Sequence, residues 1–390
     1  MAIALVASLS QVAPSSAAEK KSGGTLTVGI FDSFPGYCMA DNLANSALMA
    51  GRTVYESWVE QRADGKMVPY VLSTIENSPD FKTWKLTVRD GITFHDGTPV
   101  NADALVTNLQ ALRGALTLLG RAPSPGTAGG FTANITTVTK VSDMTVTVQL
   151  YRAQTDFLET LYASGRFFVR APSQILGGAK CSTTPIGTGP FKLVSTKLNE
   201  LVVAKNENYW RKDMPYMDRL IIRYVRDPAG RAAAMEAGDI HIGVFNPVAP
   251  PDIKRLTATG KFVATPKGYE ESVWSTTLEC SLRNPVFAKR EVRQAIFHAI
   301  DRNFLAKTIY YGYARPGTSP IYSPNKEFYT TDTYSTAFDP KKAAALLDAA
   351  GYPKKADGKR FAINLLAAGW FTENGKIGAP VKGATLIGDG

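Results

Sequence analysis

The chain has 390 residues, of which 44% are hydrophobic and 20% are charged, a composition that is typical of globular proteins and excludes a largely disordered chain. At roughly 100–200 residues per domain, we expect two or three domains. The net charge of +10 raises the question of a nucleic-acid partner, but the lysines and arginines are scattered, without a basic block or a binding motif. We interpret the charge as that of a basic soluble protein.

The first residues, MAIALVASLSQVAPSSAAEKK, contain an apolar run from Ala2 to Leu9, followed by small residues up to Ala18. This pattern is typical of the hydrophobic region and cleavage site of a secretory signal peptide, although the usual positive charges before the run are missing. The run is too short to span a bilayer, and no later run is long enough. We expect residues 1–18 to be a signal peptide and the mature chain to be exported and soluble, without a lipid anchor.

Elements of the first half are predicted from alternation, caps and turns. Residues 25–30 are predicted as a strand and residues 46–59 as a helix. Two later strands are indicated because apolar residues alternate with polar ones, in the first at Trp84, Leu86 and Val88, and in the second at Val146, Val148 and Leu150. Asn101 is placed to cap a helix over residues 102–113, and the Gly-, Pro-, Ser- and Thr-rich residues 120–134 predict a mobile surface loop.

Two helices of the second half have clear start and stop signals. Asp227-Pro228 begins one that Gly238 ends, and Asp339-Pro340 begins another that Gly351 ends. Strands are expected at residues 220–225 and 361–366. Helices and strands therefore mix along the chain, and we predict an α/β, or mixed α+β, fold.

The stretch TPIGTGPFKL, residues 184–193, concentrates glycine and proline before an apolar run. It lacks the spacing of a phosphate-binding loop, and Pro190 removes an N–H that such a loop would use. The sequence after it is strand-like. Because glycine lets two backbones approach closely, we interpret the stretch as a crossing of the chain between two domains.

The sequence offers no recognisable catalytic site. Its three histidines, His95, His241 and His298, form no zinc-protease motif, and a Ser nucleophile elbow and a defensible Cys–His arrangement are also missing. His95 is interpreted as a hydrogen-bonding residue of a turn, and His298 as structural. Three cysteines, Cys38, Cys181 and Cys280, allow three pairings, of which we favour Cys181–Cys280; three unpaired thiols are the alternative.

Several segments in order resemble the large extracytoplasmic solute-binding proteins of ABC importers, family 5, which carry dipeptides, oligopeptides and nickel chelates. The resemblance spans most of residues 24–366. It is carried by VYESWVEQRADGKMVPYVLSTIENSPDFKTWKLTVRDGITFHDGTPVNADAL from Val54, TPIGTGPFKLV from Thr184, NENYWRKDMPYMDRLIIRYVRDPAGRAAAMEAGDIHIG from Asn206, and VFAKREVRQAIFHAIDRNFLAKTIYYGYARPGTSPI from Val286.

This resemblance implies a two-lobed periplasmic-binding-protein-like fold with an inserted subdomain. Residues 19–53 and 182–272 would form the hub domain of lobe I, residues 54–181 the inserted subdomain, and residues 273–390 the start of lobe II. Members of the family continue well beyond the point where this chain stops, and the resemblance fades near Leu366. We therefore expect an incomplete second lobe and impaired binding, because an unfinished lobe leaves apolar faces and sheet edges uncovered.

The function implied is that of the periplasmic solute-binding component of an ABC importer. It would capture a peptide-like or chelate ligand in a cleft between the lobes and deliver it, as a monomer, to a membrane permease, with no catalysis, cofactor, metal site or nucleic acid. A ligand that contacts both lobes favours the closed form by its differential affinity. The alternatives are a secreted receptor or chaperone-like binder without transport, and a secreted hydrolase. Peptide, nickel chelate, opine and oligosaccharide all stay open as ligands.

Six residues are candidates for ligand binding. The loop after the first strand lines the cleft in this family, and here it offers Phe34, Tyr37 and Met39, whose apolar side chains suit varied ligands. GRFFVRAPSQI, from Gly165, resembles a segment that supplies an arginine near the ligand in nickel-binding relatives, so Arg166 or Arg170 is placed to bind a carboxylate. Trp274 lies at the second crossing. The alternatives are loop or core packing for the apolar residues and solvation for the arginines.

Overall fold

The structure is a computed structural model of the 390-residue chain. It divides into two compact units, Met1–Phe262 and Val263–Gly390, which are described separately. It describes residues 21–31, 34, 36–38, 45–62, 64–116, 129–244, 248–265, 278–317, 319, 329–333, 337–363, 365–366 and 380–381. The predicted signal peptide, residues 1–18, lies outside these residues.

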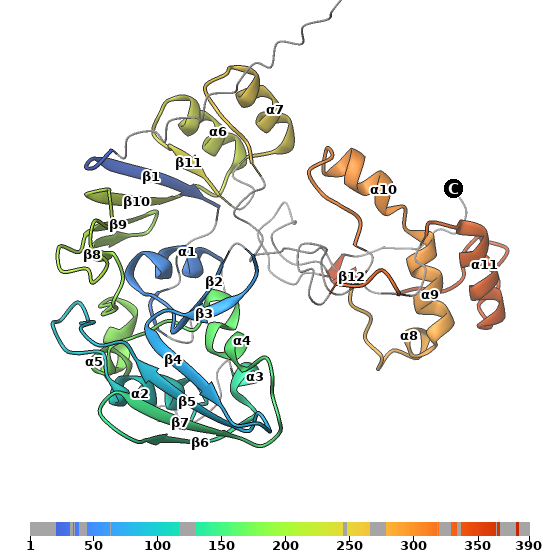
Figure 1. The fold of residues 1–390 in the computed structure, drawn as a ribbon. Helices are drawn as coiled ribbons and strands as arrows, with labels where there is room; N and C mark the ends of the chain where they lie inside the picture. Colours follow the sequence, from blue (N-terminus) through green and yellow to red (C-terminus); the bar gives the residue numbers. More distant parts are fainter. Residues whose placement is uncertain are drawn as a thin grey trace, which may run out of the picture. The chain divides into compact units, whose positions relative to one another are not determined.

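The first unit contains a five-stranded sheet in the order β11-β1-β10-β9-β8 (Figure 1). Its strand β1 (Thr25–Ile30) runs parallel to β10 (Arg219–Tyr224) and to β11 (Ile242–Gly243), whereas β9 (Glu200–Lys205) is antiparallel to β10 and to β8 (Phe191–Lys197). Helix α1 (Asn45–Val54) packs on this sheet, and its Leu48, Ala50 and Val54 join the buried strand residues in one hydrophobic cluster.

A second, antiparallel sheet has the order β4 (Leu72–Asn77), β5 (Thr83–Val88), β7 (Thr145–Leu150), β6 (Ile135–Lys140). The alternation predicted from the sequence is observed, because Trp84, Leu86 and Val88 are buried beneath helix α2 (Ala102–Leu112). Asn101 caps α2 as expected, its side-chain oxygen accepting a hydrogen bond from the N–H of Ala104 at 3.0 Å.

Short elements complete this part of the unit. They are the paired strands β2 (Val59–Gln61) and β3 (Met67–Pro69), the helices α3 (Gly129–Thr132), α4 (Phe157–Tyr162) and α5 (Pro172–Ile175), and the 3₁₀ turns Ala163–Gly165 and Gly178–Ser182. Within the loop predicted at residues 120–134, residues 129–132 are helical; residues 117–128 lie outside the described part of the chain.

The segments of the chain that connect the two sheets lie next to each other. Helix α1 ends at Val54 rather than continuing to residue 59 as predicted, because the chain then runs extended, with the carbonyl of Glu56 accepting from the N–H of Val169 at 2.8 Å. The N–H of Gly189 donates to the carbonyl of Val54 at 2.9 Å, and a Cβ at Gly189 would collide with that peptide group. TPIGTGPFKL thus leads into β8 and uses glycine for close backbone approach.

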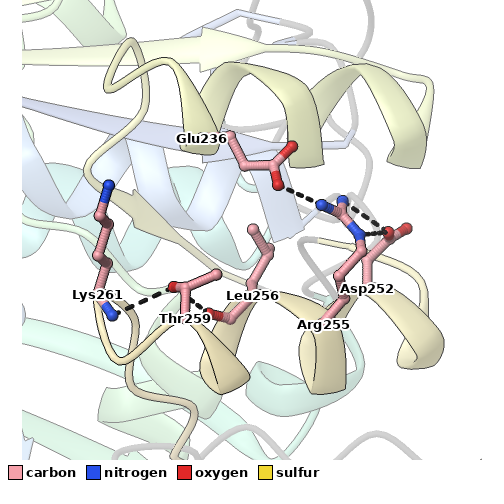
Figure 2. A network of polar contacts seen from close by, with 6 residues as sticks. All are labelled: Glu236, Asp252, Arg255, Leu256, Thr259 and Lys261. Atoms are coloured by element: carbon pink, nitrogen blue, oxygen red, sulfur yellow. Dashed lines mark hydrogen bonds and ion pairs between the residues drawn. The ribbon is translucent and has the colours of Figure 1, made fainter.

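Helices α6 (Pro228–Glu236) and α7 (Pro250–Ala258) lie beside β11 and are joined by a polar network (Figure 2). Arg255 of α7 donates to Asp252 of the same helix at 2.9 Å and to Glu236 of α6. Asp227 caps α6 as predicted, accepting from the N–H of Gly230 at 2.7 Å.

The second unit is mainly helical where it is described. It contains α8 (Pro285–Ala288), α9 (Arg290–Ala299), α10 (Arg302–Phe304) with a π-helical turn (Leu305–Ile309), α11 (Pro340–Ala349), and the paired strands β12 (Leu365–Leu366) and β13 (Pro380–Val381). Of the strand predicted over residues 361–366, the described residues are in a strand only at Leu365–Leu366. His298 is buried, with Nδ1 2.7 Å from the carbonyl oxygen of Ala337, which agrees with the structural interpretation.

Among the described residues, no helix combines the length and the apolar character that crossing a membrane requires.

Candidate functional site

The loop after β1 brings Phe34 and Tyr37 together. Their rings meet edge to face with centroids 4.5 Å apart, and the ring of Tyr37 also lies against Tyr55. Phe34 is half-buried, whereas Tyr37 is 2% exposed, and burial raises the pKa of its hydroxyl, as do Tyr55 and Tyr224, so that it stays neutral. Met39 and Trp274, the other apolar candidates, lie outside the described residues. Ligand contact by these side chains stays a prediction.

Three hydrogen bonds fix the backbone of Tyr37. Its N–H donates to the carbonyl of Ser182 at 3.2 Å. Its carbonyl oxygen accepts from Nε of Arg170 at 3.3 Å and from Nε2 of Gln174 at 3.4 Å. The peptide group before and the peptide group after Tyr37 are therefore both held by residues 170–182.

A disulfide joins the next residue, Cys38, to Cys181, with the two Cα atoms 5.0 Å apart. The favoured pairing Cys181–Cys280 is therefore wrong, and Cys280 is a free thiol. The physical reason is that Cys181 sits in the 3₁₀ turn Gly178–Ser182, which the loop after β1 contacts through the Tyr37 N–H and the Ser182 carbonyl, so that Cys38 is its neighbour. The cross-link spans 143 residues of sequence, so no local pattern points to it.

Arg170 is almost completely buried, with 1% of its surface exposed. Its guanidinium lies over the rings of Tyr55 and Phe168, at 4.8 and 5.3 Å from the centroids, in addition to the hydrogen bond to Tyr37. Stacking of this kind stabilises a buried guanidinium. The described contacts of Arg170 thus point inward, toward the loop, and its predicted contact with a ligand carboxylate stays a prediction.

Arg166 is half-buried and lies near Arg52 of α1, which sequence reasoning missed. Burial lowers the pKa of Arg166, and the positive charge of Arg52 lowers it further, while Nη2 of Arg52 donates to the hydroxyl of Tyr162 at 2.6 Å. A Cβ at Gly165 would collide with the Arg52 guanidinium, and its φ of 74° also favours glycine. Two neighbouring guanidiniums create a field that attracts an anion.

A second polar cluster, also missed from the sequence, surrounds the buried carboxylate of Glu56. It accepts from the hydroxyls of Tyr70 and Tyr209 at 2.7 and 2.6 Å and from Nε1 of Trp210 at 2.7 Å. Burial raises its pKa, while these donors oppose the rise. The cluster joins the segment after α1 to the segment after β9. The NENYW motif, with Tyr209 and Trp210 side by side, was the signal that could have directed attention here.

His95 is hydrogen-bonded to the crossing segment that contains Gly187 and Gly189. Its N–H donates to the carbonyl of Gly187 at 2.8 Å, and Nε2 lies 3.0 Å from the carbonyl oxygen of Gly189. Burial lowers the pKa of the imidazole to about 4, so at neutral pH Nε2–H is the donor and the ring is uncharged. The expected hydrogen-bonding role of this turn histidine is thus observed. The described residues contain no group of three or more His, Cys, Asp or Glu arranged to hold a metal ion.

Comparison with known proteins identifies the family. The model of the bacterial extracellular solute-binding proteins, family 5, matches residues 57–383. The chain belongs to this family. The resemblance read from the sequence is confirmed.

Two curated members show how far the similarity reaches. The nickel-binding periplasmic protein of Escherichia coli K12 is 28% identical over 319 residues, covering 78% of this chain and 57% of the relative. The glutathione-binding protein GsiB of Pectobacterium atrosepticum is 26% identical over 324 residues, covering 83% of this chain and 60% of the relative. The chain thus spans little more than half the length of these family 5 proteins.

Solved structures of the family agree on the fold. NikA of Brucella suis in complex with Fe(III)-EDTA has a TM-score of 0.65 at 25% identity, covering 86% of this chain and 66% of that one. The oligopeptide-binding protein AppA of Bacillus subtilis with a nonapeptide has a TM-score of 0.69 at 20% identity, covering 87% and 67%. The expected mixed α/β fold of the two-lobed periplasmic binding proteins is confirmed.

Proposed function

We propose that this family 5 protein captures a small solute in the periplasm and delivers it to the membrane permease of an ABC importer. The observation that carries the proposal is the family match over residues 57–383, together with relatives that bind nickel and glutathione. Binding would shift the population toward a closed form, because a ligand that contacts both lobes has a higher affinity for that form.

The domain organisation belongs to the same proposal. Residues 19–53 and 182–272 form the hub of lobe I, residues 54–181 the inserted subdomain, and residues 273–390 contribute to lobe II. The composition of the two sheets supports this division, since the five-stranded sheet draws on residues 25–30 and 191–243 and the four-stranded sheet on residues 72–150. An ATPase and a permease, both separate chains, complete the importer.

The ligand is proposed to be a peptide-like molecule or a chelate that carries a carboxylate. Arg166 supports this class, because it lies beside Arg52 and the two positive charges favour an anion between or near them. Phe34 supplies apolar contact from the loop after β1. Tyr37 packs on Phe34 within the loop and Arg170 donates to the Tyr37 carbonyl, while Met39 and Trp274 remain candidates for direct contact.

A thermal-melt screen tests the proposal. The probes are nickel with L-histidine, glutathione, and a set of di- and tripeptides, each at a large excess over the protein. A ligand that binds only the native state stabilises it by about 2.7 kcal/mol at 100 times its dissociation constant. We expect one probe class to raise the melting temperature, and Arg166→Ala to reduce that rise.

The matched control is Arg62→Ala, which removes an exposed arginine next to β2. It should leave the ligand-induced rise unchanged. A cooperative melt that no probe shifts would contradict the peptide and chelate classes together. Turnover of a probe would instead favour a secreted hydrolase.

A further inference from the structure

The side chain of Gln174, on the short helix α5, contacts several segments that lie far from it in the sequence. It is 3% exposed. Its Nε2 lies 3.4 Å from the carbonyl oxygen of Tyr37, 3.0 Å from that of Cys181 and 2.7 Å from the hydroxyl of Tyr55. Its Oε1 lies 3.0 Å from the same hydroxyl and accepts from the N–H of Ile186 at 2.9 Å.

A glutamine amide has two N–H donors and one carbonyl acceptor with two lone pairs. The distances allow two assignments of protons, which differ at the Tyr55 hydroxyl: one N–H donates either to that hydroxyl at 2.7 Å or to the carbonyl of Tyr37 at 3.4 Å. We use the second, in which the other N–H donates to Cys181 and Oε1 accepts from the Ile186 N–H and the Tyr55 hydroxyl, because it also gives the Tyr55 O–H an acceptor. Glutamate would lack both donors, methionine would lack every polar group, and asparagine would be one methylene shorter. The site is therefore specific for glutamine.

The disulfide and Gln174 act on neighbouring residues of the loop, Cys38 and Tyr37, and both also reach Cys181. The Cys38–Cys181 bond fixes the separation of two chain segments, and Gln174 donates to the carbonyl of Tyr37 on one segment and of Cys181 on the other. Arg170 adds a second donor to the Tyr37 carbonyl. A disulfide limits how far the chains can move apart, whereas hydrogen bonds to the peptide carbonyl also fix its orientation.

We propose that Gln174 is a positioning residue for ligand binding. With Arg170 and the Cys38–Cys181 disulfide, it holds Tyr37 in place and thereby fixes Phe34, which packs on the Tyr37 ring, in the orientation that meets the ligand. This inference rests on the proposed function and adds a residue that does not itself touch the ligand. Fixing a loop before binding raises affinity, because its ordering no longer opposes association.

Gln174→Glu tests the donor half of this arrangement. The carboxylate still accepts from Ile186 and Tyr55 but cannot donate to Tyr37 and Cys181. We expect exchange of the Tyr37 amide, measured by hydrogen–deuterium exchange, to quicken about tenfold, while the Ile186 amide stays protected. Gln174→Met should expose both amides. The matched control is Gln154→Glu, whose hydrogen bonds go to Thr160 and Asn134 and should leave both amides unchanged.

Affinity is measured on the same proteins by titration calorimetry with nickel plus L-histidine and with glutathione. For a probe that binds the wild-type chain, Gln174→Glu should weaken binding about tenfold, since about 1.4 kcal/mol corresponds to a factor of ten. Faster exchange at Tyr37 with unchanged affinity would overturn the proposal. So would unchanged exchange in a folded Gln174→Glu protein.

Two further arms keep these outcomes separate. If the wild-type chain binds neither probe, the proposed function fails for those ligands, and exchange at Tyr37 alone decides whether Gln174 positions the loop. If Gln174→Glu does not fold, Gln174→Asn replaces it, because its amide keeps both donors but is one methylene shorter. The same loss of protection at Tyr37 is expected, and unchanged protection in folded Gln174→Asn would overturn the proposal.

Discussion

The two sheets of the first compact unit are assembled in different ways. The four strands β4 to β7 come from one stretch, residues 72–150, and every neighbouring pair is antiparallel. The five-stranded sheet instead pairs β1 in parallel with β10, so that Thr25 lies opposite Arg219. In the four-stranded sheet the most distant pairing, β5 with β7, joins Thr83 to Gln149. The five-stranded sheet requires closure of a much longer loop, between β1 and β10, whose entropic cost must be met by contacts elsewhere.

The segments between the sheets supply such contacts, some apolar, such as the stacked rings of Tyr55 and Phe168, and some polar. The cluster around the four-stranded sheet is apolar, with Trp58, Leu86 and Val146 fully buried. By contrast, the buried charged or amide side chains of Glu56, Arg170, Gln174 and Asn206 belong to the connecting segments. Apolar burial thus stabilises each sheet, while directional hydrogen bonds specify how the segments between them meet. Four changes test this division, beginning with the largest expected effect.

Leu86→Ala should produce the largest loss of stability. Leu86 is fully buried on β5, so its truncation removes apolar contacts and leaves a cavity, which costs about 2–5 kcal/mol. The measurement is the free energy of unfolding from urea titration. Leu198→Ala is the matched control, because this leucine is 93% exposed and its loss should change stability by less than about 0.5 kcal/mol. Equal losses at both positions would contradict the burial pattern.

Glu56→Gln should cost less, about 1–3 kcal/mol, and should act on the junction rather than on either sheet. The amide keeps the shape but replaces one accepting oxygen with a donor that faces Tyr70, Tyr209 or Trp210. Unfolding free energies of Glu56→Gln, Tyr209→Phe and the double variant measure the coupling. Strictly additive losses would show that the Glu56–Tyr209 hydrogen bond contributes nothing.

His95 should give stability a pH dependence between about pH 6.5 and 4. Its folded pKa is depressed to about 4 by burial, so the native state binds fewer protons than the unfolded state in this window. The free energy of unfolding that the neutral His95 contributes is fully present above the pKa of the unfolded state. It decreases as the pH falls, and the loss is about 1 kcal/mol near pH 5.5. The raised pKa of Glu56 acts in the opposite sense, since that contribution is lost as the pH rises.

His95→Gln separates these two contributions. The glutamine amide can still donate to the Gly189 carbonyl but does not titrate, and Glu56 is unchanged in both proteins. The difference in unfolding free energy between wild type and variant should therefore narrow as the pH falls from about 7.5 to 5. A difference independent of pH would show that the imidazole of His95 does not titrate as its burial implies.

These regions also differ in how well the sequence predicts them. The four-stranded sheet was accessible, because alternation at Trp84, Leu86 and Val88 and the cap at Asn101 are local signals. The crossing at Gly187 and Gly189 was predicted from the glycines and prolines of that stretch, whereas the joining of distant segments into one five-stranded sheet was implied only by the family resemblance.

Buried polar groups were the least predictable part of the site. Gln174 and Glu56 look like ordinary surface residues in sequence, and only tertiary packing reveals their partners. The cysteine pairing was wrong for the same reason, since Cys38 and Cys181 meet across 143 residues. Contacts of this kind are set by which segments the fold brings together, and no local window of sequence contains that information.

The polar network between α6 and α7 should give the smallest effect and the one most sensitive to salt (Figure 2). Arg255 reaches Glu236 and Asp252 from an exposed position, so solvent screens the charges and ordering the long side chain offsets part of the gain. Arg255→Met keeps the apolar stem and removes the charge. Its destabilisation, measured as a shift of the urea midpoint, should shrink when the salt is raised to about 1 M, where the Debye length falls to about 3 Å.

Thr259→Ala provides the uncharged control for the same network. The hydroxyl of Thr259 donates to the carbonyl of Leu256 at 2.6 Å and accepts from the N–H of Lys261 at 3.2 Å. Since neither bond joins two charges, its loss should be the same at low and high salt. If salt affected both variants equally, the response would belong to the net charge of the whole chain and not to the Arg255 network. That result would show that the α6–α7 contact is stabilised by apolar packing, as the two sheets are, here through Leu256, Ala232 and Val248.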